Sequence, residues 1–368
     1  MKRVAGHIVF TLIVIISQNA GAQSIYEFDY GFGSVIAHKN TLSHLVLSHP
    51  NYYQFTVLKP SDTSRIWKRR FNYPDQGIGL IVQDFKNNLL GQTVGVNYHT
   101  TFYLRDRNKA GQFLLNMGLG LSYNTRPFDM ENNNKNSVIS SSIIYNQVIT
   151  LNYQWQFSDN WFLKTGLGFT HFSNASFRQP NNGINSAFLN FGIKHHKTGN
   201  SLTYPKPQKP ALPDVRKINY GITGKVGFHE PYPGLGTHVV YEINPFVSKQ
   251  YFPMGNINAG IDFTFSQADK VYAEYLYVSK VENPERILEN HNRIGLYLGY
   301  EQVFNNISCE ADLGYYLYKK LDDTYTNMYE NIKIKYKIKN TKFKVGLGLK
   351  LHLIKANFAS LDLQYQCF

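Results

Sequence analysis

A histidine and a serine stand two positions apart at the end of a strongly alternating segment. His171 and Ser173 close the segment 161–173, whose other odd positions are mainly apolar. Side chains of a β-strand repeat every two residues, so both polar groups lie on one face of the predicted strand. Imidazole can take and return the proton of a serine hydroxyl near neutral pH. The pair therefore indicates nucleophilic attack on an acyl ester.

An asparagine in the next alternating segment supplies the third group that such a pair needs. Asn185 begins the apolar face of the segment 184–195. If the two segments form a hairpin centred near Arg178, His171 and Asn185 face each other with Cβ atoms ~4.5–5.5 Å apart. The amide oxygen of Asn185 can then hydrogen-bond the imidazole and fix its tautomer, as in cysteine–histidine–asparagine sites.

The three residues after Ser173 complete the predicted site. Asn174, Ala175 and Ser176 lie where the strand turns, and their backbone N–H groups are candidates for an oxyanion hole. Serine and asparagine are also common at the start of loops, and an isolated His-x-Ser motif matches often by chance. The shared outward phase of the histidine, the serine and the asparagine favours a catalytic site, with all three groups facing lipid.

Alternation over segments of about ten residues defines the fold class. Residues 112–123 place apolar side chains at odd positions, and residues 342–353 repeat the pattern with lysines and glycines opposite. Such length is typical of membrane-spanning strands, whereas strands of soluble sandwiches are shorter. Abundant tyrosine (27), phenylalanine (25) and glycine (28) fit the same class. We predict an all-β, antiparallel transmembrane β-barrel of the bacterial outer membrane, with about 12–16 strands.

The alternating segments number seventeen, and at least one must be wrong because single-chain bacterial barrels have even counts. Short connections such as Ser158–Asn160 predict periplasmic turns, and longer ones such as 126–138 predict outer loops. The predicted strands are 24–36, 51–59, 76–84, 92–104, 112–123, 147–157, 161–172, 184–195, 217–228, 237–248, 255–266, 270–280, 291–302, 306–318, 328–338, 342–352 and 356–367.

The chain is expected to begin with a signal peptide over 1–22, in which a positive start precedes a short apolar run and small residues. Residues 23–368 are predicted to form a single barrel. In it, 23–196 carry the candidate site, the proline-rich segment 197–216 is a loop or linker, and 217–368 add further strands. Two eight-stranded barrels joined by this segment are the alternative. One barrel is favoured because the second half carries no motif of its own.

The charge of the chain and the positions of its histidines and cysteines limit the molecules and ions that it is expected to bind. The formal charge of +13 suits nucleic acid or an anionic lipid surface, and export from the cytoplasm favours lipid. The adjacent His195 and His196 would point to opposite faces of a strand, so no metal site is predicted. Cys309 and Cys367 are too few for a disulfide framework.

The residues of the candidate site resemble the active-site hairpin of the lipid A 3-O-deacylases, which are PagL-like acyloxyacyl hydrolases. The similarity rests on His171-Phe-Ser173-Asn174-Ala175 and on Gln179-Pro-Asn-Asn-Gly-Ile184, with a looser strand pattern through roughly the first 195 residues. It implies an outer-membrane serine esterase that removes an ester-linked acyl chain from lipid A without a metal or cofactor. Ser173 would be the nucleophile, His171 the base and then the acid, and Asn185 the group that orients the base.

One departure from that family leaves alternatives open. The deacylases carry glutamate where this chain has Asn185, whereas the outer-membrane phospholipase A family has asparagine at this offset from the histidine. A phospholipase A-like enzyme, which would require calcium and dimerisation, is therefore one alternative. A non-catalytic porin-like or structural barrel is another, since the lysines near 333–350 are expected to line the interior. The predicted partners are lipopolysaccharide and membrane lipids, without nucleic acid, and a homodimer remains an option.

Overall fold

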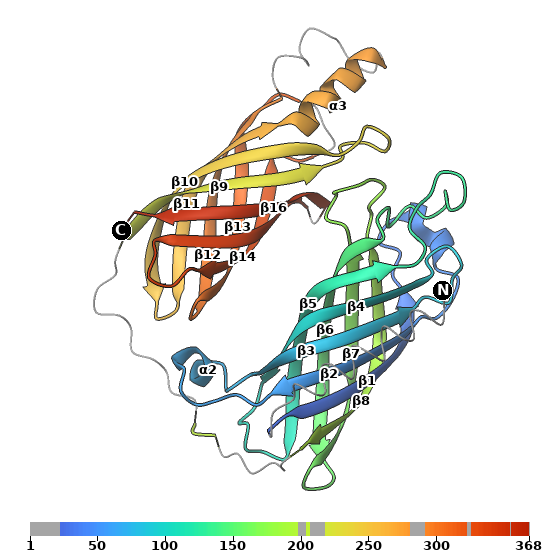
Figure 1. The fold of residues 1–368 in the computed structure, drawn as a ribbon, viewed down its shortest axis with the longest axis vertical. Coiled ribbons are helices and arrows are strands. Elements are labelled where there is room, and N and C mark those ends of the chain that lie inside the picture. Colours follow the sequence, from blue (N-terminus) through green and yellow to red (C-terminus); the bar gives the residue numbers. More distant parts are fainter. Residues whose placement is uncertain are drawn as a thin grey trace. The chain divides into compact units, whose positions relative to one another are not determined.

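The computed structural model contains two closed antiparallel barrels of eight strands each (Figure 1). The chain divides into two compact units. One consists of Met1–Asn174 and Asn182–Lys209, and the other consists of Ala175–Asn181 and Pro210–Phe368. The structure describes residues 23–197, 204–206, 218–279, 291–321, 325–353 and 355–367.

Barrel 1 carries the candidate site. Each strand pairs with the next along the chain, and β8 closes the sheet by pairing with β1. A 3-10 helix, η1 (Asn40–Leu45), lies between the first two strands, and α2 (Ile66–Arg70) follows the second. The strands are β1 (Ile25–Val35), β2 (Asn51–Lys59), β3 (Asp75–Asp84), β4 (Gln92–Tyr103), β5 (Gly111–Asn124), β6 (Ile143–Gln156), β7 (Trp161–Ser173) and β8 (Ile184–His196).

Barrel 2 has the same up-and-down order and closes through pairing of its last strand with its first. A helix, α3 (Gln267–Val278), connects its third and fourth strands. The strands are β9 (Ile218–His229), β10 (His238–Phe252), β11 (Gly255–Ser266), β12 (Arg293–Phe304), β13 (Ile307–Lys319), β14 (Met328–Lys337), β15 (Phe343–His352) and β16 (Lys355–Gln366).

The predicted fold class is confirmed, but the prediction of a single barrel is wrong. The ladder closes when β8 pairs with β1, which leaves no free sheet edge for β9 to join. The alternative of two eight-stranded barrels is the arrangement found. The expected signal peptide, 1–22, lies outside the described residues, as does most of the proline-rich segment 197–216.

The surplus strand of the sequence prediction is a helix. Residues 270–280 carry three tyrosines among aliphatic residues, but most of this segment forms α3. The Ser266 side chain caps this helix by accepting a hydrogen bond from the backbone N–H of Asp269 at 2.9 Å. Ala273 and Leu276 lie on the side of the helix that is buried. The other sixteen predicted segments each overlap a strand. No helix in the described ranges is both long and apolar enough to cross a membrane.

Charged side chains fill the interior of both barrels. In barrel 1, the Lys164 ammonium lies 2.8 Å from a Glu27 oxygen and 3.0 Å from an Asp29 oxygen. In barrel 2, the Lys333 ammonium lies 2.8 Å from Glu310 and 2.6 Å from Asp312. An eight-stranded barrel is only wide enough for its own side chains. Of the lysines near 333–350 that were expected to line the interior, Lys333, Lys335, Lys344 and Lys350 do so as members of ion pairs, whereas Lys337, Lys339 and Lys342 are exposed.

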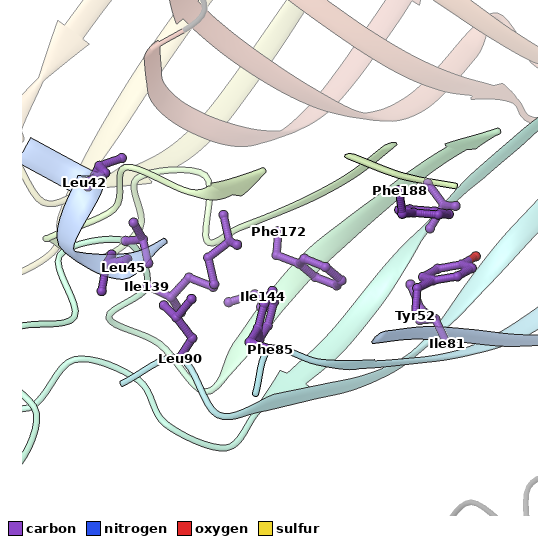
Figure 2. Close-up of a cluster of buried hydrophobic side chains, with 13 residues drawn as sticks. Leu42, Leu45, Tyr52, Ile81, Phe85, Leu90, Ile139, Ile144, Phe172 and Phe188 are labelled. Carbon is purple, nitrogen blue, oxygen red and sulfur yellow. The ribbon is translucent and has the colours of Figure 1, made fainter. Parts of the chain in front are cut away.

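A cluster of apolar side chains fills the end of barrel 1 that carries η1 and the longer connections (Figure 2). Phe172 and Ile184 belong to it, and both are almost fully buried. The ring of Phe172 meets that of Phe85 edge to face, with centroids 6.1 Å apart. The cluster consists of Leu42, Leu45, Tyr52, Ile81, Phe85, Leu90, Val138, Ile139, Ile144, Val148, Phe172, Ile184 and Phe188.

Candidate active site

Strands β7 and β8 place His171 directly opposite Asn185, which confirms the predicted hairpin register. His171 Nδ1 lies 2.5 Å from Asn185 Oδ1. An amide oxygen can only accept a hydrogen bond, so Nδ1 carries the ring proton of the neutral imidazole. The other ring nitrogen, Nε2, is then left with the lone pair that a general base needs.

The neighbours of these residues hold them in place. Phe172, one residue from His171, points into the apolar cluster (Figure 2), and Ile184, one residue from Asn185, belongs to the same cluster. Because strand side chains alternate, the two polar groups take the outward phase, and both are half-buried. Ser173 shares this phase but is only 3% exposed, so it is enclosed rather than open to lipid as the sequence suggested.

A tyrosine that the sequence analysis missed completes the group. Tyr145 on β6 is the cross-strand partner of Ser173, and its hydroxyl lies 2.8 Å from His171 Nε2. Its hydroxyl is also hydrogen-bonded to the Ser173 side chain. Because Nε2 can only accept, Tyr145 donates its proton there and its oxygen accepts the proton of Ser173. A phenol therefore stands between the predicted nucleophile and the predicted base.

The turn after Ser173 contains the three predicted oxyanion-hole residues. Asn174 donates its side-chain amide to the hydroxyls of Ser140 at 3.1 Å and Ser141 at 3.0 Å. Ala175 and Ser176 have positive φ angles of 55° and 66°, so the chain reverses sharply there. Both belong to the segment that groups with the second compact unit. Their role as oxyanion donors stays a prediction.

Among the described residues, no group of three or more histidine, cysteine, aspartate or glutamate side chains could hold a metal ion. Cys309 and Cys367 are free thiols.

Two family models match the chain, and together they cover most of it. One is described as lipid A 3-O-deacylase (PagL) and matches residues 51–194, which include every member of the site from Tyr145 to Asn185. The other, the C-terminal domain of acyloxyacyl hydrolase, matches residues 218–368. These matches correspond to barrel 1 and barrel 2 respectively.

Solved structures are similar only at low scores. The outer membrane enzyme PagL shares 14% identity over 45% of this chain and 97% of its own, with a TM-score of 0.32. A Rhodopseudomonas blastica porin shares 8% identity over 93% of this chain and 99% of its own, with a TM-score of 0.18. No match was found among curated protein sequences. From the two family models, the chain belongs to the lipid A 3-O-deacylase (PagL) family of ester hydrolases in the bacterial outer membrane.

Proposed function

We propose that the chain removes an ester-linked acyl chain from lipid A through Ser173 as nucleophile, His171 as base and Asn185 as the orienting group. The 2.5 Å hydrogen bond between His171 Nδ1 and Asn185 Oδ1 is the observation that supports this most. It directs the basic lone pair of Nε2 away from Asn185 and toward the hydroxyl groups of Tyr145 and Ser173.

Attack begins when Ser173 Oγ bonds to the ester carbonyl carbon. Its proton moves to the Tyr145 oxygen as the proton of Tyr145 moves to His171 Nε2, so one proton is transferred over two hydrogen bonds. The tetrahedral oxyanion would accept hydrogen bonds from backbone N–H groups among Asn174, Ala175 and Ser176. Asn185 keeps the imidazolium in place, although its neutral amide contributes less charge stabilisation than a carboxylate would.

Collapse of the intermediate breaks the bond between the acyl carbon and the sugar oxygen. That oxygen takes the proton back from His171, which leaves an acyl group on Ser173. A water molecule then gives a proton to the same base and attacks the acyl carbon. The bond from that carbon to Ser173 Oγ breaks, the fatty acid is released, and the departing Oγ takes the proton back from His171 through Tyr145. Serine, histidine and tyrosine thus end the cycle in their starting protonation states.

The substrate class is tested with purified protein in detergent micelles that contain lipopolysaccharide or phospholipid, each with and without a chelator. We expect loss of one acyl chain from lipid A, little release from phospholipid, and no effect of the chelator. Mass spectrometry of the lipid products measures all three. Preferred release from phospholipid that stops on chelation would instead favour the phospholipase alternative, to which the asparagine at 185 pointed.

The porin-like alternative is weakened by the interior of barrel 2. It relied on a basic strand set that could attract anions. In the described part of that barrel, Lys333, Lys335 and Lys350 each contact a buried carboxylate. These pairs occupy an interior that eight strands make only wide enough for side chains.

Gly183 is expected to be essential for the position of the base. It has a φ of +75°, and a Cβ added there would lie 2.8 Å from His171 Cε1. Gly183→Ala should displace the imidazole and lower kcat for acyl release by about tenfold or more, because small misplacements of catalytic groups are costly. Gly234→Ala is the matched control, since Gly234 also has a positive φ but nothing lies within 4 Å of an added Cβ. Equal activity of the two folded variants would contradict this role.

A further inference from the structure

His38 contacts the far side of the Asn185 amide. Asn185 Nδ2 donates to His38 Nδ1 at 3.2 Å, while Asn185 Oδ1 faces His171. His38 lies in the connection between β1 and η1 and is exposed. The amide therefore bridges two imidazoles, with its nitrogen on one and its oxygen on the other.

Hydrogen bonds on both sides of His38 hold its segment against β8. The backbone N–H of Ile36 donates to the carbonyl oxygen of Asn185 at 2.8 Å. The Lys39 ammonium donates to the side-chain oxygen of Asn182 at 2.7 Å. The position of His38 is thus set by the residues that flank it in the chain, independently of its own contact with the amide.

An amide at position 185 creates a choice that a carboxylate does not. With its oxygen toward His171, it requires the ring proton on Nδ1 and leaves Nε2 free to act as a base. If the amide flips, its NH₂ group faces His171 and pairs with an unprotonated Nδ1, which moves the ring proton to Nε2 and removes the base. Both oxygens of a carboxylate accept, so a carboxylate selects the productive tautomer whichever way it turns.

We propose that His38 is a positioning residue that selects the amide orientation of Asn185 and, through it, the tautomer of His171. The proposal rests on the proposed function, because the atom that it protects is the base nitrogen Nε2. By accepting from Asn185 Nδ2, His38 leaves the amide oxygen for His171. The four hydrogen bonds from Ser173 through Tyr145, His171 and Asn185 to His38 then run in one direction, so each polarises the next favourably.

The test is a double-mutant cycle that combines His38→Ala with Asn185→Glu, using acyl release from lipopolysaccharide as the assay. In the natural background, His38→Ala should lower kcat about five- to tenfold, the worth of one hydrogen bond, and leave KM unchanged. In the Asn185→Glu background it should have little effect, because a carboxylate needs no orientation. Equal losses in the two backgrounds, or no loss in the natural one, would overturn the proposal.

If the Asn185→Glu variant is inactive, a second comparison tests the positioning role of His38. His38→Asn keeps an acceptor near the position of Nδ1 and should retain most of the activity, whereas His38→Leu should fall as far as His38→Ala. Similar losses for the asparagine and leucine variants would refute the positioning role.

Two controls show whether a loss of activity comes from the His38 contact or from the catalytic group itself. His44→Ala should be neutral, because the exposed imidazole of His44 lies 2.9 Å from the backbone carbonyl of Lys135 and does not belong to the series of hydrogen bonds from Ser173 to His38. Ser173→Ala tests the proposed function. If that variant kept its activity, the function would fail whatever the His38 variants did, whereas an inactive Ser173→Ala with unaffected His38 variants would reject only the positioning role.

Discussion

Ser173→Ala is expected to lower the rate of acyl release from lipid A by about 10⁴-fold or more, as loss of the nucleophile does in other serine hydrolases. In the proposed mechanism the Ser173 oxygen forms the acyl-enzyme, and an alanine side chain has no atom that can do so. Removal of one oxygen from a 3% exposed side chain leaves the register of β7 intact. The measurement is mass spectrometry of lipid A after incubation with the folded variant.

Ser34→Ala is a suitable control for this change. Ser34 lies on β1, and its hydroxyl donates to the neighbouring carbonyl of Val35 at 3.2 Å. Loss of that hydroxyl should leave acyl release unchanged. If the Ser173 variant released acyl chains as fast as the Ser34 variant, the assignment of Ser173 as nucleophile would be wrong.

Tyr145→Phe is expected to lower kcat by about 10²- to 10⁴-fold, the range typical of a lost general acid–base contact. The change removes the oxygen through which, in the proposed mechanism, the proton of Ser173 reaches His171 Nε2. It keeps the ring that packs beside the imidazole, with centroids 5.5 Å apart. Binding of lipid A should change little, so the loss should appear in kcat rather than in KM.

Tyr153→Phe is the matched variant for this measurement. Tyr153 lies on the same strand and the same face of β6 as Tyr145, and its ring meets that of Phe113 edge to face at 5.1 Å. The Tyr153→Phe variant should be as active as the natural chain. An active Tyr145→Phe variant would mean that Ser173 passes its proton directly to His171, with the phenol only occupying that space in the free protein.

The candidate site was predictable to the extent that β-hairpins are symmetric. A turn centred near Arg178 pairs His171 with Asn185, and β7 and β8 have this register. The same reasoning would have found Tyr145. The predicted turn at Ser158–Asn160 is centred on Asp159 and therefore pairs residues 145 and 173, as β6 and β7 do. Tyr145 was missed because the predicted strand 147–157 began four residues after the start of β6 at Ile143 and therefore left Tyr145 out.

Other features could not be derived from alternation. A period of two residues shows which side of a strand faces inward, but it does not show which strands pair to close a sheet. One large barrel and two small barrels therefore give the same alternation in the sequence. His38 lies in a connection without a repeat, and its approach to Asn185 depends on tertiary contacts made by Ile36 and Lys39. In α3, tyrosines at 272, 275 and 277 gave the segment a strand-like composition, which concealed the helical spacing of Ala273 and Leu276.

In the proposed function, the outward phase of His171 and Asn185 determines how substrate arrives. A lipid in the surrounding leaflet reaches this wall by lateral diffusion and never passes through the barrel lumen, where the ion pairs of Lys164 lie. The released fatty acid stays dissolved among the lipids of the membrane. The turnover rate thus depends on the mole fraction of substrate among the lipids of the membrane. Dilution of the substrate with an inert amphiphile slows turnover even when the bulk concentration of substrate is constant.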